Sequence, residues 1–355
     1  MRSKKVTLGA ATAGAVAGVV GLVLLSAPAG AGQAPSLPRT TPETLVSSVL
    51  DAKPAAFAGT VEVDNELGLP ALPNLPQLGD GKSDFRVWSD GAGRSRVALP
   101  SQDAERTLVD DGRTLWAWNS ADRTVTKIDA GAREHQQGKR DEALTDPGSM
   151  AKQLVTAVRR SSDVGVDGTA SVAGRDAYQL VLTPKPTERT LLRQVRVAVD
   201  DKLRMPLAVD VYTNGSAQPA LHVGYSNLDV GAQQPSLFRF SPPAGTKVTE
   251  PRAEQRTSRV PDVRAVGSGW DTVLIGTLPE DMLTPGTAQP DAAEQGGTAD
   301  PMALLKRFGQ RVSGSWGEGW VISTKVGSAL VTTDGKVAAG FVPKQVLTTT
   351  LGRIK

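Results

Sequence analysis

The chain has 355 residues, no cysteine and a formal net charge of +3, from 40 lysines and arginines against 37 aspartates and glutamates. Arg2, Lys4 and Lys5 account for that excess, so the rest of the chain is formally neutral. Nucleic-acid binding needs a basic footprint that a neutral chain lacks, and an anionic membrane surface is not an obvious electrostatic partner either. The absence of cysteine excludes disulfides, a thiol nucleophile and thiolate metal sites, so stability must come from burial.

The N-terminus has the pattern of an export signal. The three basic residues precede an apolar stretch over residues 8–25, and Ala29 and Ala31 give the small-x-small pattern of a signal-peptidase site. We therefore expect a signal peptide over residues 1–31, cleavage near Ala31, a tether over residues 32–40 and an extracytoplasmic location in a cell envelope. An uncleaved anchor is the alternative, because the apolar stretch is nearly long enough to span a bilayer. No cysteine lies near the cleavage site, which excludes a lipid-modified N-terminal cysteine.

Two short helices are predicted in the first half of the chain. Thr41, Pro42 and Glu43 are typical of a helix start, with Thr as the cap, Pro in the first turn and an acid beside it. Apolar residues at helical spacing extend this helix over residues 42–52. A second apolar stripe predicts a helix over residues 146–160.

Most of the segment from residue 57 to residue 240 alternates apolar and polar side chains, which is the pattern of half-buried strands. An Asp-Gly pair between apolar runs, as at Asp111–Gly112, is typical of a hairpin. Consecutive strands with short turns and no helix between them predict an antiparallel meander. The predicted strands cover residues 57–67, 83–88, 94–99, 107–109, 114–118, 124–128, 177–182, 195–199, 207–212 and 221–225.

The predicted sheet has one apolar face that needs a cover. In the strands around Val197 and Val209, the opposite face carries charged side chains such as Arg196 and Asp210. The two predicted helices are short against a sheet of this size. A closed barrel, or a curved sheet with a partly filled concavity, would satisfy the requirement. A fully packed core without a cavity is an equal alternative.

Leucine and proline alternate between residues 67 and 78, where this density of proline excludes both a helix interior and a central strand. We expect an extended apolar loop that caps the mouth of the sheet or touches a hydrophobic ligand. The lid candidates are Leu69, Leu72 and Leu75. A lid that packs permanently on the core is the alternative.

A second, smaller domain is predicted at the C-terminus. The polar run over residues 249–262 is expected to be a linker, a compact α+β domain to follow over residues 263–355, and residues 284–300 to form a flexible loop within it. The expected elements are strands over 270–276, 320–324, 329–333 and 337–342, with helices after residue 300 and over 343–351. The expected core residues are Trp270, Trp316, Trp320 and Phe341.

No catalytic constellation emerges from the sequence. The two histidines, His135 and His222, fall in a charged loop and in the polar phase of a strand, and neither has a partner cluster for a metal. No Gly-x-Ser-x-Gly elbow is present. The acid pairs Asp110–Asp111, Asp200–Asp201 and Glu280–Asp281 fall at predicted turns, where they favour tight backbone geometry. We therefore expect a binding protein without a metal or cofactor, and not an enzyme.

Six segments, in this order, resemble the LolA-like outer-membrane lipoprotein carrier family in the version found in actinobacterial envelopes. They are residues 57–61, 67–70, 85–88, 114–118, 172–178 and 238–243. The resemblance covers about residues 41–248 and implies a mainly β (α+β) fold, in which a curved, unclosed antiparallel half-barrel wraps around short helices and holds acyl chains in an apolar cavity. The layout with a second, smaller domain is also similar to the periplasmic sensor of the same superfamily that holds an anti-sigma factor and releases it on binding lipid-bearing molecules.

These observations lead to one main hypothesis and two alternatives. The main hypothesis is an extracytoplasmic carrier or chaperone that holds the acyl chains of a lipid or lipoprotein by apolar burial. The first alternative is an envelope-stress sensor that binds the extracytoplasmic segment of a membrane-anchored anti-sigma protein. The second is a structural wall-associated protein with a filled core. The cavity candidates are Val61, Phe85, Val87, Trp116, Trp118, Leu180, Leu182, Val197, Val209 and Val211.

Overall fold

The computed structural model describes residues 35–69, 79–100, 104–129, 147–250, 263–278 and 307–353. Several predictions concern residues outside these ranges. They are the signal peptide, the lid residues Leu72 and Leu75, His135, most of the linker, the loop over residues 284–300 and the start of a helix after residue 300.

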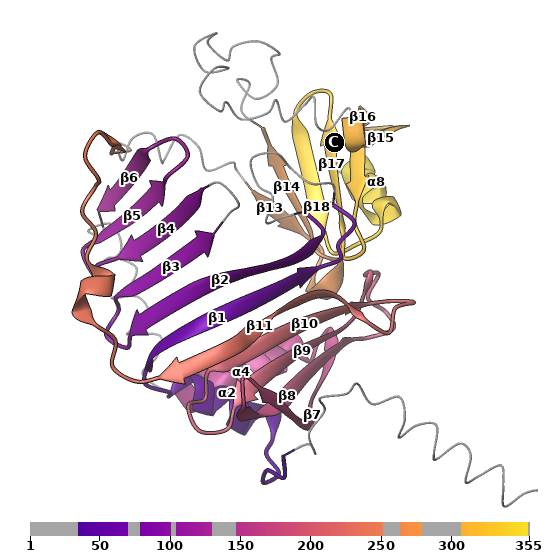
Figure 1. Cartoon of the computed structure of the whole chain (residues 1–355). Helices are drawn as coiled ribbons and strands as arrows, with labels where there is room; N and C mark the ends of the chain where they lie inside the picture. Colours follow the sequence, from indigo (N-terminus) through magenta and orange to yellow (C-terminus); the bar gives the residue numbers. More distant parts are fainter. Residues whose placement is uncertain are drawn as a thin grey trace, which may run out of the picture.

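The large domain is built on one 12-stranded sheet in the order β12-β6-β5-β4-β3-β2-β1-β11-β10-β9-β8-β7. Its strands are β1 (Ala56–Asn65), β2 (Gly81–Asp90), β3 (Ser95–Pro100), β4 (Glu105–Asp110), β5 (Thr114–Asn119), β6 (Thr124–Asp129), β7 (Ser162–Val172), β8 (Arg175–Pro184), β9 (Leu192–Asp200), β10 (Pro206–Thr213), β11 (Pro219–Val230) and β12 (Lys247–Thr249). Every neighbouring pair is antiparallel except β12 and β6, which run parallel. The sheet curves strongly and stays open, with β12 and β7 at its edges (Figure 1). The predicted fold class, a mainly β chain with an unclosed antiparallel half-barrel, is confirmed.

The meander forms because each strand alternates in side-chain character and the turns between strands are short. Strands β7 and β12 are absent from the sequence prediction. β7 contains Gly165 and Gly168, and its register with β8 shifts between Val166 and Thr169, so it lacks a regular apolar alternation. β12 is only three residues long and all of them are exposed. Glycine-interrupted and very short strands carry little periodic signal.

Two helices lie against the β7 end of the large sheet (Figure 1). Helix α2 (Pro42–Leu50) begins as predicted, with the Thr41 hydroxyl accepting a hydrogen bond from the backbone N–H of Thr44 at 3.2 Å. Helix α4 (Pro147–Val158) packs against α2. Leu45 of α2 is 1% exposed and packs against Tyr178 and Val199 of the sheet. The helices therefore cover the sheet by burying apolar side chains.

The segment before α2 is also attached to the large domain. The side chain of Leu37 packs against the cluster around Leu45. The Thr169 hydroxyl of β7 donates a hydrogen bond to the carbonyl oxygen of Pro35 at 2.7 Å. The described part of the expected tether, residues 35–40, is thus in contact with the edge of the sheet.

After β11 the chain crosses the opposite side of the sheet as a strap, which we define as residues 235–249. The strap begins with the 3-10 helix η2 (Pro235–Phe238), which contacts β3, and ends with β12 beside β6. Phe238 of the strap is 1% exposed. The strap therefore closes this part of the sheet surface.

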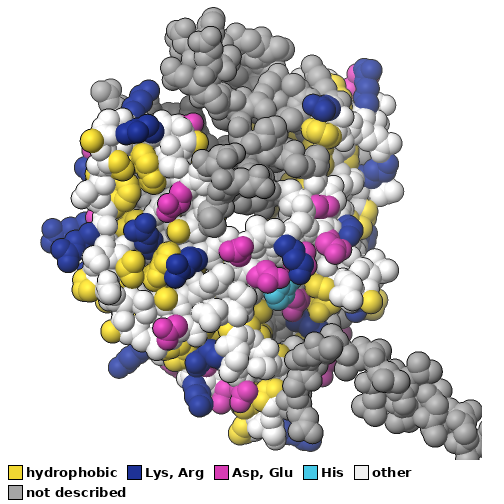
Figure 2. Space-filling view, in the orientation of Figure 1, with side chains coloured by type: hydrophobic (Ala, Val, Ile, Leu, Met, Phe, Trp, Pro, Cys, Tyr) yellow, Lys and Arg dark blue, Asp and Glu magenta, His cyan; other side chains and the backbone are white. Residues whose placement is uncertain are grey.

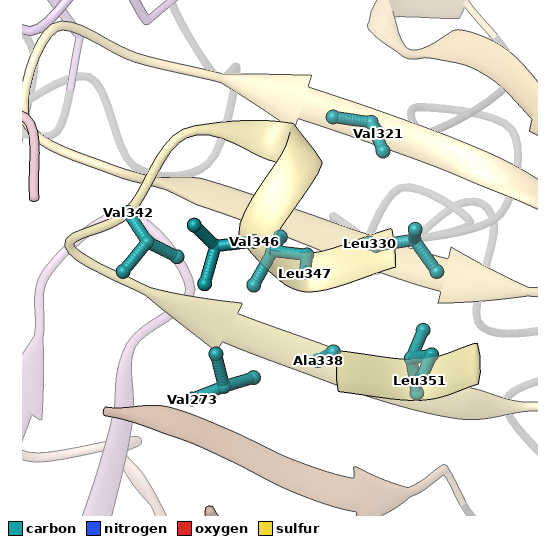
Figure 3. Close-up of a cluster of buried hydrophobic side chains, with 8 residues drawn as sticks. All are labelled: Val273, Val321, Leu330, Ala338, Val342, Val346, Leu347 and Leu351. Atoms are coloured by element: carbon teal, nitrogen blue, oxygen red, sulfur yellow. The ribbon is translucent and has the colours of Figure 1, made fainter. Parts of the chain in front are cut away.

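The small domain contains a six-stranded sheet in the order β13-β14-β18-β17-β16-β15. Its elements are β13 (Arg264–Val266), η3 (Gly269–Asp271), β14 (Val273–Thr277), β15 (Gln310–Gly314), β16 (Gly317–Ser323), β17 (Ser328–Thr332), β18 (Lys336–Gly340) and α8 (Lys344–Arg353). Helix α8 covers one face through Val346, Leu347 and Leu351, and these side chains meet Val273, Val321, Leu330, Ala338 and Val342 (Figure 3).

The expected aromatic core of the small domain is only partly correct. Trp316 packs against the α8 cluster. Phe341 is 55% exposed, so its assignment to the core is wrong. It lies immediately after the end of β18 and outside the cluster that α8 covers. Trp270 contacts the large domain instead of the α8 cluster, as described below.

Candidate ligand-binding face

The strand register defines two faces of the large sheet, because directly paired residues in an antiparallel sheet point to the same side. The helix-bearing face is the one on which Leu45 packs. It contains Tyr178 and Val199, which are paired across β8 and β9. The outer face is the opposite one, and it carries Asp210 and His222, which are paired across β10 and β11.

Eight of the ten cavity candidates lie together on the helix-bearing face. One row across the sheet pairs Leu180 with Val197, Val197 with Val209, and Val209 with Val223. Val223 in turn pairs with Val63, two residues from Val61 on the same face of β1. The eight candidates on this face are Val61, Phe85, Val87, Leu180, Leu182, Val197, Val209 and Val211.

Helix α2 contacts only part of this apolar face. Its cluster includes Leu180 and Val197 on β8 and β9. Farther along the sheet, on β10 and β2, the side chains of Val209, Val211, Phe85 and Val87 are partly exposed. Two side chains on the same face are more exposed, Leu108 at 39% and Val230 at 38%. The apolar face therefore continues beyond the surface that α2 buries.

The other two candidates, Trp116 and Trp118, point to the outer face. Leu108 lies on the helix-bearing face and pairs with Ala117, so the two tryptophans on either side of Ala117 face away. Phe240 of the strap lies 5.7 Å from Trp116 and 6.5 Å from Trp118, measured between ring centres. The expectation that these tryptophans line the same cavity as Val61 is wrong, because strand alternation gives that place to Leu115 and Ala117.

Of the three lid candidates, the described residue is Leu69, which is half-buried. The carboxylate of Asp80 closes the base of this loop by accepting hydrogen bonds from the backbone N–H groups of Gly68 at 2.8 Å and Leu69 at 3.1 Å. The loop base also touches the small domain, since the N–H of Lys325 donates to the carbonyl of Leu67 at 2.8 Å. Both ends of the proline-rich loop are thus anchored.

Acidic and basic side chains gather near the middle of the outer face (Figure 2), where Asp64, Asp210 and His222 lie in one cross-strand row. His222 Nδ1 lies 2.6 Å from Asp210 Oδ1. This hydrogen bond raises the pKa of His222 above its ordinary value of 6.5, against the lowering effect of burial. The sequence shows no metal-ligand cluster around His222, and the polar phases of β10 and β11 are the signal that could identify Asp210 as its neighbour.

In the ranges that the structure describes, no group of three or more His, Asp or Glu side chains is placed to hold a metal ion. His222 and Asp210 have each other as partners, on a face where the charges of Lys82, Glu62 and Asp64 also meet. The same part of the chain contains no helix long and apolar enough to cross a membrane.

The two domains meet at the end of β7, β8 and β9, through residues that no local pattern marks as contacts between domains. The indole N–H of Trp270 donates to Ser162 Oγ at 2.7 Å, and its backbone N–H donates to Glu188 Oε2 at 2.8 Å. Arg189 pairs with Asp271 at 3.1 Å. Further hydrogen bonds join Thr190 and Leu191 to the carbonyl of Phe341 at 2.5 and 3.0 Å.

The small domain has an apolar patch on the face opposite α8. We define this patch as Val263, Leu274 and Phe341, which are 53%, 50% and 55% exposed. Leu274 pairs with Ala265 on β13 and with Ala339 on β18. Val263 and Phe341 lie two residues from these partners, immediately outside the ends of β13 and β18. Large exposed apolar side chains that gather in one place are typical of an interaction surface.

Comparison with known proteins gives structural likenesses only. No family model and no curated protein matches the sequence. Among solved structures, the chain is similar to MucB in complex with MucA(peri), with 16% identity, 87% of this chain and 95% of that chain covered, and a TM-score of 0.44. It is similar to a chain of the Pseudomonas aeruginosa MucA/MucB complex, with 17% identity, coverage of 87% and 95%, and a TM-score of 0.42.

A further likeness is to the LolA superfamily protein NE2245 from Nitrosomonas europaea, with 12% identity, coverage of 57% of this chain and 99% of that chain, and a TM-score of 0.25. With TM-scores below 0.5, these likenesses establish neither a family nor a function for the chain.

Proposed function

We propose that the chain is an exported carrier or chaperone that holds the acyl chains of a lipid or lipoprotein on the helix-bearing face of its large sheet. The observation that supports this proposal is the placement of Val209, Val211, Phe85 and Val87. They lie side by side with Val61 on the face that α2 covers, on strands outside the α2 cluster, and they remain partly exposed. The proposal agrees with the resemblance of the sequence to LolA-like carriers.

The chemistry of this face fits an acyl chain. Its members are aliphatic and aromatic, so binding would be driven by removal of apolar surface from water, at about 0.8 kcal/mol for each buried methylene. An acyl chain needs no hydrogen-bond partner along its length, and the paired residues on this face offer none between Val197 and Val223. The charged side chains Arg196, Asp210 and His222 lie on the outer face. Binding of this kind involves no covalent step, so we propose a binding protein and not an enzyme.

The test is a pair of variants on the two faces of the sheet. Val209→Asp places a carboxylate in the apolar row, and Thr60→Asp places the same group on the outer face, where Thr60 pairs with Arg86. We expect Val209→Asp to abolish uptake of a fluorescent fatty acid and of lipid that co-purifies, measured by native mass spectrometry without detergent. Thr60→Asp should bind as wild type. Equal uptake by a folded Val209→Asp variant would refute the assignment of the face.

A second candidate function is favoured by the small-domain patch of Val263, Leu274 and Phe341. An exposed apolar surface at this position suits a protein partner, such as the extracytoplasmic segment of a membrane protein. Because Phe341 also accepts hydrogen bonds from Thr190 and Leu191 of the large domain, a partner bound here would touch the domain boundary. The corresponding function is an envelope-stress sensor that binds a membrane-anchored anti-sigma protein through this patch.

The second function is tested by in-cell photo-crosslinking from position 274. A crosslink to one membrane protein that is lost in Phe341→Asp and kept in Leu154→Asp would support it. Leu154 is a matched control because it is 48% exposed on α4 of the large domain. A crosslink that survives Phe341→Asp would exclude the patch as the binding surface.

A further inference from the structure

Three side chains on the outer face of β2 and β3 form a compact cationic and aromatic group, which we call the Arg86–Trp88–Arg96 patch. The guanidinium carbon of Arg86 lies 4.8 Å from the ring centre of Trp88, and that of Arg96 lies 6.0 Å from it. Trp88 and Arg96 are directly paired across the two strands. Arg86 lies two residues from Trp88 and therefore points to the same side.

Among the described residues, neither Arg86 nor Arg96 forms an ion pair with a carboxylate. Elsewhere on this half of the outer face the basic residues are paired, Arg94 with Asp90 at 2.5 Å and Lys127 with Glu250 at 2.9 Å. A tryptophan ring attracts a cation without neutralising its charge. The patch therefore presents two guanidinium groups that form no ion pair with a described carboxylate, on a face that also carries Asp84 two residues from Arg86.

The cross-strand neighbours of Trp88 on β1 and of Arg86 on β1 and β3 are small. Ala58 is paired with Trp88 across β1 and β2, and Thr60 and Ala98 are the two partners of Arg86. Arg86 is exposed, and Trp88 and Arg96 are partly exposed. Figure 2 shows basic and hydrophobic side chains interleaved over the β2–β6 half of this face. This part of the outer face thus combines two positive charges with an adjacent apolar ring.

We propose that the Arg86–Trp88–Arg96 patch docks the chain on the anionic headgroups of a membrane surface. Guanidinium groups bind phosphate oxygens in a planar, two-pronged geometry. Tryptophan is favoured at the level of the headgroups because its ring is apolar and its N–H is polar. Removing a positive charge from such a surface weakens attraction to anionic lipid.

An acidic peptide is the competing occupant, and the position of the patch argues against it. An extended peptide is usually bound by adding to a free strand edge or by lying in a groove. Strands β2 and β3 both have hydrogen-bonded neighbours on each side, so neither offers a free edge. A peptide therefore cannot add to the sheet as a strand at this position, whereas a tryptophan between two guanidinium groups suits the headgroup level of a membrane. The patch also lies on the face opposite the proposed acyl-chain site, so this inference stands apart from the proposed function.

The experiment is vesicle co-sedimentation of the full chain with phosphatidylcholine alone or mixed with phosphatidylglycerol. We expect binding that needs the anionic lipid and falls with salt, and that weakens about tenfold or more in Arg86→Gln/Arg96→Gln. The matched control is Arg193→Gln/Arg196→Gln. These two arginines flank the ring of Tyr212 at 5.2 and 5.4 Å, and they lie on β9 with Asp210 as the cross-strand neighbour of Arg196. The control should bind vesicles as wild type.

Every variant carries the same N-terminal segment, so the difference between the two double variants isolates the patch. Equal loss in both double variants would overturn the proposal, because any removal of charge would then suffice. Unchanged binding in a folded Arg86→Gln/Arg96→Gln chain would also overturn it. Binding of an acidic polypeptide, with none to anionic vesicles, would reassign the patch to a protein partner. Fatty-acid uptake measured on the same samples is expected to be unchanged, which separates this result from a failure of the acyl-chain site.

Discussion

Trp270 and Ser162, 108 positions apart in the chain, are joined by a hydrogen bond of 2.7 Å from the indole N–H to the serine hydroxyl. Ser162 is 1% exposed at the start of β7, and Trp270 lies in η3 of the small domain. The bond therefore connects the edge strand of the large sheet to the small domain. The neighbouring contact of Glu188 with the backbone N–H of Trp270 makes the indole position well defined.

Trp270→Phe should loosen this boundary while keeping an aromatic ring in place. The variant leaves the buried hydroxyl of Ser162 without its donor, at a cost of about 1–2 kcal/mol in unfolding free energy. Urea unfolding measures that cost, and small-angle scattering measures any change in the arrangement of the domains. Trp316→Phe, in the core of the small domain, is the control for a general loss of tryptophan. If Trp270→Phe unfolds at the wild-type urea concentration, the bond does not stabilise the boundary.

Asp200 should make the large domain sensitive to acid. It is 1% exposed, its carboxylate accepts a hydrogen bond from Arg175, and the backbone N–H groups of Lys202 and Leu203 donate to it at 2.7 and 2.6 Å. Burial acts to raise the pKa of Asp200, but these donors outweigh it and hold the pKa below the ordinary value of 3.8. The stabilisation is thus fully present above about 3.8 and is lost as the pH falls through the lower, folded-state pKa.

Asp200→Asn tests this account. We expect a loss of about 3 kcal/mol at neutral pH, because the variant removes one member of a largely buried ion pair. The difference from wild type should shrink as the pH falls below the folded-state pKa. Asp201→Asn, next in the chain and partly exposed, is the matched control. If the difference in unfolding free energy between wild type and Asp200→Asn did not change with pH, ionisation of Asp200 would not be the cause of the stabilisation.

His222 gives the opposite dependence on pH. Its pKa is raised, first by the hydrogen bond to Asp210 and then by the charges of Asp210, Glu62 and Asp64, against the opposing effect of burial. The stabilisation is fully present below 6.5 and is lost as the pH rises through the higher, folded-state pKa. His222→Gln should therefore destabilise the protein more in mild acid than in alkali, by about 1 kcal/mol or less because solvent screens this pair. Proton NMR titration of the imidazole checks the direction of the shift.

Phe240 should hold the strap on Trp116 and Trp118. Phe240→Ala removes a half-buried ring from both tryptophans, and we expect a loss of about 2 kcal/mol, below the range for fully buried phenylalanines. Tryptophan fluorescence should shift to longer wavelength as the rings become wet. Phe308→Ala is the control, because Phe308 is 41% exposed. An unchanged emission spectrum would show that other contacts shield the two tryptophans.

Local sequence patterns determined most of the strands and both helices of the large domain. Alternation of apolar and polar residues is a local property, so β8 to β11 are readable wherever it is regular. Thr41 and Pro42 likewise mark the start of α2 because capping involves only the first turn. β7 could not be predicted from the sequence because Gly165, Gly168 and a register shift interrupt its alternation.

Strand register decided the candidate site. Each strand shows two faces in the sequence, but only pairing tells which face of one strand continues which face of the next. Val209 and Val61 share a face through Val223 and Val63, whereas Trp116 and Trp118 fall on the other side of the sheet. An apolar residue in a strand therefore has no assigned side until its partners are known.

The sequence by itself determined most of the strands and helices and their order, because propensity, capping and alternation act over a few residues. Only the tertiary structure decided the hydrogen bond between Trp270 and Ser162, the contacts of Arg86 and Arg96 with the ring of Trp88, and the exposure of Phe341. Those contacts depend on which distant segments of the chain come together in the fold. Side-chain packing and strand register decide this, and neither is a local property of the sequence.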